Sequence, residues 1–323
     1  MMRKLSAVCL LLLISVFSVF ADETSGDKVW GATVPSVFMI YIVNPDILAG
    51  WSYKFYPYEE KFISEKYKSL PFLGGWHNEG GIPDREMLMR EKVKRAFIIS
   101  SSSHNVNQMI PELRKMGIET FTMKGSDMND YIVMLRELGR ELSVPERGEE
   151  LAAYSEKAVE KTKEMTKGLK DSEKLRVYVA GGKNGLRSGC NYEELALSGV
   201  INALECLSPD MRGAQQVSFE QIVAMNPDVV LITDPFFGYG YKKDSRWKRL
   251  RAYKTNRIFV VPYGPFGWME KPAVMKFMAV QWLTCNMYPE KCTVDIKSET
   301  KNFMKLFLHL DLTDAQVEEM LRQ

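Results

Sequence analysis

Short apolar runs alternate with amphipathic stretches along this chain, and the alternation predicts parallel strands separated by helices. Each run is nearly continuous and rich in β-branched residues, which is typical of strands buried on both faces. The expected strands are 29–34, 96–99, 119–123, 176–180, 228–233 and 257–261. The expected helices are 106–116, 127–142, 192–204, 219–225, 271–283, 303–308 and 313–321, with one more that Ser36 is placed to cap.

One helix–strand unit occurs twice at the same spacing. Glu86 opens a short predicted helix and Lys92 follows six residues later, while Glu220 opens another with Asn226 six residues later. A predicted buried strand follows each of the two units. A unit used twice predicts two similar α/β lobes, and a cleft between lobes is where small ligands bind.

A long amphipathic stretch separates the two units. Its apolar residues recur at steps of three and four: Leu151, Tyr154, Ala158, Thr162, Met165 and Leu169. A helix of about 25 residues spans roughly 38 Å, enough to cross both lobes, and its stiffness predicts little tilting between them. The predicted fold class is α/β, two Rossmann-like lobes with parallel sheets (22–144 and 172–323) joined by one long rigid α-helix (145–171).

The first 21 residues have the pattern of a secretory signal peptide. Arg3 and Lys4 precede the apolar run 5–20, and cleavage is expected after Ala21. The alternative is a membrane anchor, but the run is shorter than the roughly 20 residues that span a bilayer. A soluble exported protein is therefore expected.

Four cysteines follow the signal, and an even number permits disulfides in an oxidising compartment. Cys285 and Cys292 are close in sequence and are the first pair expected. The pairing of Cys190 with Cys206 stays open, because an intervening helix can hold the two apart. No Cys-x-x-Cys spacing indicates a metal site.

Charge argues against a nucleic-acid partner. The formal net charge is +2, and removal of the signal peptide takes two positive charges away. No basic stripe with interleaved aromatic residues is present, which is the usual footprint of nucleic-acid binding.

Two segments carry a family resemblance. Residues 218–233, SFEQIVAMNPDVVLIT, and 247–262, WKRLRAYKTNRIFVVP, resemble consecutive elements of the periplasmic binding proteins for iron complexes and cobalamin. The resemblance covers nearly all of the chain after the signal. It implies a periplasmic binding protein, expected as a monomer, that delivers its ligand to an ABC permease and its ATPase. Ligands of that family include ferric siderophores, haem, cobalamin, metal chelates and, in one branch, molybdate or tungstate.

The resemblance also implies how the protein docks. Family members present one acidic residue on each lobe to permease arginines, and the matching positions here are Glu86 and Glu220. The alternative is that both are helix caps, since a carboxylate also stabilises a helix start. Their equal offset in the repeat favours docking, although Val93 and Lys94 stand where the family usually has Pro-Asp.

The loops that follow the strands supply the candidate ligand contacts, because ligands of parallel α/β sheets lie at the carboxyl ends of the strands. Aromatic rings there can stack on a planar chelate, and polar groups can meet an anion or a metal. The predicted contacts are Ser36, Trp76, His77, Ser103, His104, Arg187, Tyr192, Phe236, Tyr239, Tyr263, Phe266 and Trp268.

Three of these assignments have named alternatives. Arg187 lies in a glycine-rich loop and is the first candidate for an anion contact, but it is also a possible solvated loop arginine. His77 and His104 are either metal ligands or ordinary loop residues. The aromatic cluster at 51–58 either forms a ligand wall or packs beneath a loop.

The expected function is binding for import, not catalysis. The chain has no Gly-x-Ser-x-Gly, His-Glu-x-x-His or phosphate-loop motif, so no cofactor is expected, only a bound metal chelate or metal oxyanion. A metal complex such as a siderophore, haem or cobalamin is the first ligand expected, and a molybdate-type oxyanion is the alternative. An exported enzyme or an adhesion module on the same scaffold are the competing functions.

Overall fold

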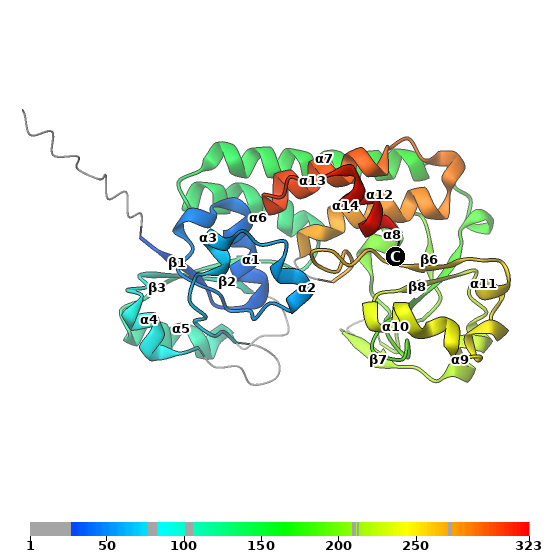
Figure 1. Ribbon diagram of the computed structural model, residues 1–323, viewed down its shortest axis with the longest axis horizontal. Helices are drawn as coiled ribbons and strands as arrows, with labels where there is room; N and C mark the ends of the chain where they lie inside the picture. Colours follow the sequence, from blue (N-terminus) through cyan, green and yellow to red (C-terminus); the bar gives the residue numbers. More distant parts are fainter. Residues whose placement is uncertain are drawn as a thin grey trace, which may run out of the picture.

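Two α/β lobes lie side by side in the computed structural model, and helix α7 (Pro145–Thr166) runs along the same side of both (Figure 1). The structure describes residues 27–76, 83–100, 106–208, 211, 213–270 and 273–322. The predicted fold class of two lobes with parallel sheets joined by a long helix is confirmed. In the described ranges, each helix is too short or too polar to span a membrane.

The N lobe is built on a parallel sheet with the strand order β1-β2-β3. Its strands are β1 (Val29–Gly31), β2 (Arg95–Ser100) and β3 (Glu119–Lys124). Its helices are α1 (Val34–Val43), α2 (Pro57–Glu60), α3 (Glu65–Lys68), α4 (Arg85–Arg90), α5 (Val106–Lys115) and α6 (Met128–Glu141), with the 3-10 turn η1 (Pro45–Ile47). The cap of α1 is Thr33, not Ser36 as predicted, and the first strand ends early for this reason.

The C lobe has a parallel sheet in the order β6-β4-β8-β9 and a separate antiparallel pair, β5 with β7, that was not predicted. Its strands are β4 (Arg176–Ala180), β5 (Arg187–Gly189), β6 (Ile201–Asn202), β7 (Ala214–Gln216), β8 (Val229–Ile232) and β9 (Ile258–Val260). Its helices are α8 (Glu193–Leu197), α9 (Phe219–Met225), α10 (Pro235–Gly240), α11 (Arg251–Lys254), α12 (Lys276–Met287), α13 (Ile296–Leu308) and α14 (Asp314–Leu321). Its 3-10 turns are η2 (Asp171–Glu173), η3 (Tyr241–Lys243), η4 (Trp247–Arg249), η5 (Ala273–Met275) and η6 (Pro289–Lys291).

Two elements of the C lobe differ from the prediction. The helix expected over 192–204 is only the short α8, because Gly199 adopts a φ of 73° and the chain then forms the edge strand β6. The loop expected after β8 contains α10, whose first turn is capped by Asp234. That carboxylate accepts a hydrogen bond from the Phe237 backbone N–H at 2.8 Å.

Helix α7 packs on both lobes. At the N lobe it approaches α6 so closely that a Cβ added to Gly139 would lie 2.7 Å from the Cα of Gly148. At the C lobe it packs on α12 and α8. The helix ends at Thr166, short of the predicted residue 171, and Gly168 then takes a φ of 77° that most residues rarely adopt.

One hydrophobic cluster is shared by the two lobes. It contains Val29 of β1 and Val177 of β4 together with side chains of α1, α6, α7, α12 and α13. The opposite faces of the sheets pack on two smaller clusters, one containing Leu88 of α4 and the other Ile222 of α9. Because the shared cluster is continuous, we expect the lobes to keep a fixed relative position.

Two disulfides brace the C lobe. Cys285 and Cys292 join the end of α12 to the turn after it, with 4.7 Å between their Cα atoms, which confirms the first expected pair. Cys190 and Cys206 are also joined, at a Cα–Cα distance of 5.0 Å. The short α8 leaves these two residues close enough to bond, which resolves the pairing that the sequence left open.

Candidate ligand site between the lobes

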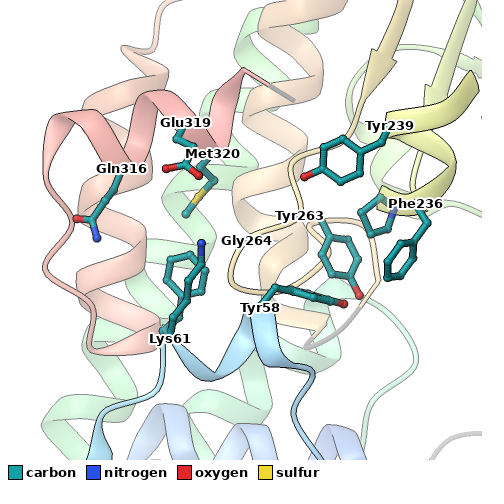
Figure 2. Close-up of a pocket in the computed structure, with 11 residues that line it drawn as sticks. Tyr58, Lys61, Phe236, Tyr239, Tyr263, Gly264, Gln316, Glu319 and Met320 are labelled. Atoms are coloured by element: carbon teal, nitrogen blue, oxygen red, sulfur yellow. The ribbon is translucent and has the colours of Figure 1, made fainter. Parts of the chain in front are cut away.

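A cavity of about 330 Å³ lies between the two lobes (Figure 2). Its size is within the range of small-molecule sites, roughly 300–1,000 Å³. The N lobe contributes α2 and the two residues after it, while the C lobe contributes α10, the loop after β9, and α14. The lining residues are Tyr58, Lys61, Phe62, Pro235, Phe236, Tyr239, Tyr263, Gly264, Gln316, Glu319 and Met320.

A buried carboxylate positions the N-lobe wall. Glu59 is 1% exposed and accepts hydrogen bonds from the Tyr53 hydroxyl at 2.9 Å and from the Tyr56 backbone N–H at 2.8 Å. Burial, together with the adjacent Glu59, raises the pKa of Tyr53, so this phenol stays a donor at neutral pH. These bonds fix the first turn of α2, from which Tyr58 points into the cavity (Figure 2).

Helix α10 exposes two aromatic rings at the cavity and is anchored by a third ring that is buried. Phe237 is 6% exposed and packs on Trp247, with 5.1 Å between the ring centroids. Its neighbours Phe236 and Tyr239 are 66% and 78% exposed and line the cavity. Open aromatic faces of this kind can stack on a flat part of a ligand.

Two phenols from opposite lobes meet at the cavity. The rings of Tyr58 and Tyr263 are 5.5 Å apart at an angle of 65°. Burial is the largest cause that raises the pKa of both phenols. At neutral pH the pair therefore offers two uncharged hydroxyls to the oxygen atoms of a ligand.

Helix α14 forms the other end of the cavity. Its Met320 is 3% exposed and holds the helix in place, while Gln316 and Glu319 are exposed on the side of Lys61 (Figure 2). The sequence predicts this helix, but it does not predict Gln316, Glu319, Met320 or Lys61 as cavity residues. The capping pattern reveals the helix, whereas its place at the cavity depends on the path of the chain after α13.

A second cavity, of about 560 Å³, lies between the start of α6 and α8 and is lined in part by Tyr192. Here Glu193 accepts a hydrogen bond from the Met128 backbone N–H at 2.8 Å, which links the two lobes, and burial raises the pKa of Glu193. The fully buried Glu194 lies 3.0 Å from the Nζ of Lys276. Within the described residues this ion pair lacks hydrogen-bond geometry.

Phe236, Tyr239 and Tyr263 are the predicted contacts that the structure brings together at the interlobe cavity. Arg187 is exposed on β5 and is not among the lining residues of either cavity, and Trp76 is half-buried, 5.8 Å from the ring of Trp30. In the described ranges, no group of three or more His, Cys, Asp or Glu side chains is placed to hold a metal ion. Three predicted contacts lie outside the described residues: His77, Ser103 and His104.

Three other predicted contacts are packed in the interior. The hydroxyl of Ser36 accepts a hydrogen bond from the Ile99 backbone N–H at 2.9 Å. Phe266 is 1% exposed and packs edge-on against Phe38 of the N lobe, with 4.7 Å between centroids. Trp268 is fully buried as well. The protein itself occupies the surfaces that these side chains were expected to offer to a ligand.

Comparison with known proteins identifies the family. A family model described as periplasmic binding protein matches residues 97–263, more than half of the chain. The chain belongs to the periplasmic binding protein family. An ABC transporter solute binding protein from Sulfurospirillum deleyianum is similar to it in structure, with a TM-score of 0.83 and 27% identity over 92% of this chain and 94% of that one.

MolA from Haemophilus influenzae is similar to this periplasmic binding protein in sequence and in fold. The molybdate-binding protein MolA is 24% identical over 137 residues, a match that spans 42% of this chain but only 39% of the length of MolA. The structure of MolA bound to molybdate has a TM-score of 0.69 at 14% identity, over 89% of this chain and 94% of that one.

In this periplasmic binding protein, the two predicted docking glutamates occupy the same position of two short helices. Glu86 comes two residues after Asp84 in α4, and Glu220 comes two residues after Ser218 in α9. Asp84 and Ser218 are the caps, since their side chains accept the N–H three residues on. The glutamates are therefore not the caps themselves, although each lies in the first turn of its helix, where a carboxylate also favours the helix dipole. Both carboxylates are exposed.

Proposed function

We propose that this protein is the ligand-binding component of an ABC importer and that it binds a compact metal complex in the interlobe cavity. The observation that carries this proposal is the phenol pair Tyr58 and Tyr263, which joins opposite lobes beside the open rings of Phe236 and Tyr239. Stacked rings and neutral hydroxyls suit a flat organic ligand whose oxygen atoms hold a metal. The likeness to the Sulfurospirillum deleyianum protein supports the transporter role.

The proposal includes export and the absence of catalysis. The protein reaches the periplasm through the signal of residues 1–21 and acts there as a monomer. It binds and releases its ligand unchanged, and the partner ATPase supplies the free energy of transport. Turnover of a candidate substrate by the purified protein, abolished in a Tyr263→Ala variant, would instead establish an exported enzyme.

Native mass spectrometry with elemental analysis, on protein taken gently from its own cell envelope, tests the ligand class. An added mass of several hundred daltons that contains iron or cobalt supports the metal complex. A ligand without metal contradicts it. The mass of the protein itself also shows whether the chain begins after Ala21.

A pair of tyrosine variants tests the site. In Tyr263→Phe the hydroxyl that meets Tyr58 is lost, and the affinity for the co-purified ligand is expected to fall about fivefold, the value of one hydrogen bond near 1 kcal/mol. Tyr56→Phe is the matched control, because Tyr56 is 51% exposed and does not line the cavity. Equal affinity in both variants would place the ligand elsewhere.

A molybdate-type oxyanion is the second candidate, and the sequence match to MolA favours it. Titration of the ligand-free protein with molybdate and tungstate, with sulfate as the control anion, separates the two candidates. Saturable binding of molybdate or tungstate that excludes the co-purified ligand supports the oxyanion.

Charge reversal tests docking on the permease. Glu86→Lys and Glu220→Lys are expected to impair uptake while ligand affinity stays unchanged, because both carboxylates lie on α4 and α9, outside the cavity lining. Glu137→Lys on α6 is the matched control, an exposed glutamate of the same lobe as Glu86. Loss of ligand affinity in the two docking variants would contradict the assignment.

A further inference from the structure

The two helices with the predicted docking glutamates share a second exposed feature. In α4 the side chain of Met89 is 61% exposed, and in α9 that of Val223 is 38% exposed. Each follows its glutamate by three residues, so the carboxylate and the apolar side chain are neighbours on one helix face, roughly 5–6 Å apart at Cβ. The same pairing therefore occurs once on each lobe.

The surrounding residues give both pairs the same orientation. Leu88 and Ile222, which directly precede the exposed apolar residues, are fully buried and fix each helix to the outer cluster of its lobe. Lys92 and Asn226 then end the two units with φ values of 52° and 44°. Both helices consequently present the same positions to the outside.

Neither carboxylate is held in a salt bridge with a residue that the structure describes. Glu86 forms no ion pair with any residue that the structure describes, and the adjacent Arg85 is held 2.6 Å from another carboxylate. Arg246 interacts electrostatically with Glu220 but is paired with Asp244 at 2.7 Å. Each helix face thus offers an available negative charge beside an apolar side chain. A partner surface that complements it has a positively charged side chain beside an apolar pocket.

We propose that Met89 and Val223 are the apolar halves of two equivalent docking surfaces for the permease, each completed by Glu86 or Glu220. The proposal rests on the proposed importer function. Helices α4 and α9 lie toward opposite ends of the molecule, on the side away from α7, so the partner presents the same complementary surface twice (Figure 1). The charge orients the encounter, while burial of the apolar side chain supplies affinity that salt does not screen.

Site-specific photocrosslinking in the cells that make this protein tests the proposal. A photoreactive phenylalanine replaces residue 86, 89, 220 or 223, one at a time, and mass spectrometry identifies the adducts. Val133 and Glu137 of α6 are the matched control positions, since Val133 is 44% exposed and Glu137 is an exposed glutamate one turn away, on a helix that packs against α7. All four docking positions are expected to give an adduct with the same multi-span membrane protein, and the control positions none.

The adducts separate this inference from the function on which it rests. Adducts from residues 86 and 220 alone overturn the role of Met89 and Val223 and leave the importer function standing. Absence of a membrane-protein adduct from all four positions overturns both. In Met89→Ser and Val223→Ser, the adduct yield from the glutamate position of the same lobe is expected to fall on the order of tenfold. An unchanged yield in both serine variants also contradicts the proposal, whereas Val133→Ser leaves the yield unchanged.

Discussion

Leu88 of the N lobe and Ile222 of the C lobe hold the same place in the same helix–strand unit, and both are fully buried beneath an exposed face. Tyr58 and Tyr263, which meet between the lobes, come from segments that share no such repeat. The comparison shows that the surface proposed to dock on the permease occurs once in each lobe, because the helix–strand unit that carries it is repeated. The surface proposed for the ligand is built from irregular segments that each lobe supplies separately.

The facing sides of the lobes also interlock. Phe266 belongs to the loop after β9 of the C lobe, yet its ring packs on Phe38 and Phe55 of the N lobe. From the other direction, the Tyr41 hydroxyl of α1 donates a hydrogen bond to the Leu308 carbonyl oxygen at 3.3 Å. The outer end of each lobe thus packs within its own lobe, whereas the facing sides are stabilised by contacts with each other.

Truncation of a buried aromatic side chain of the C lobe, compared with truncation of an exposed one, gives the largest expected effect. Phe266→Ala removes a ring packed between the lobes and is expected to lower the free energy of unfolding by about 3–5 kcal/mol. Phe236→Ala removes a ring that is 66% exposed and is expected to change it by less than about 0.5 kcal/mol. Chemical denaturation measures both, and comparable losses would show that the inner sides do not interlock through Phe266.

The repeated unit was predictable because every step of it is local. The spacing from Glu86 to Lys92 and from Glu220 to Asn226 shows where each helix ends and the next strand begins, and the structure confirms both. The apolar periodicity of α7 likewise reports a helix packed on one face. These patterns depend on neighbours within a few residues, so the sequence contains them in full.

The cavity was only partly predictable because its walls meet through the path of the chain. A strand-end rule selected Phe236, Tyr239 and Tyr263, which line the cavity, but the same rule selected Phe266, which the N lobe buries. Glu319 of α14 is more than 50 residues from any of them in sequence and follows no strand. Only the return of the chain past α13 brings it to the cavity, and no local pattern reports that step.

Two buried tyrosines, Tyr131 of the shared core and Tyr178 of the C-lobe cluster, are expected to differ in what their hydroxyls contribute to stability at neutral pH, although burial raises the pKa of both. Burial, with a smaller contribution from Asp130, raises the pKa of Tyr131 in α6 from 10.0 to about 12. Between pH 10 and 12 the unfolded chain loses a proton that the folded protein keeps, so this contribution to stability is complete below pH 10 and falls as pH rises. The loss is up to about 3 kcal/mol.

Tyr131→Phe should therefore reduce the decline of the unfolding free energy between pH 10 and 12 while it changes little at pH 7. Tyr178→Phe is the contrasting variant, because the Tyr178 hydroxyl donates a hydrogen bond to the Gly185 carbonyl oxygen at 2.9 Å. Its loss should cost about 1 kcal/mol already at pH 7. Denaturant titrations across this pH range measure both. An unchanged pH dependence in Tyr131→Phe would show that its phenol is not protected by the fold.

The smallest effect is expected in the overall shape on ligand binding. Because α7, the shared cluster and Phe266 join the lobes, the radius of gyration of ligand-free and ligand-loaded protein should agree within about 1 Å in solution scattering. The loaded sample is the protein as isolated with its ligand, and the free sample is the same protein after dialysis from partial denaturant and refolding. A contraction of several ångströms in the wild type would mean that the inner sides of the lobes separate without ligand. If Phe266 contributes to this rigidity, the difference in radius of gyration between the free and loaded samples should grow in Phe266→Ala. In Phe236→Ala it should remain at the wild-type value. This pair of results would show that the facing sides of the lobes, and not their outer ends, hold the lobes in place.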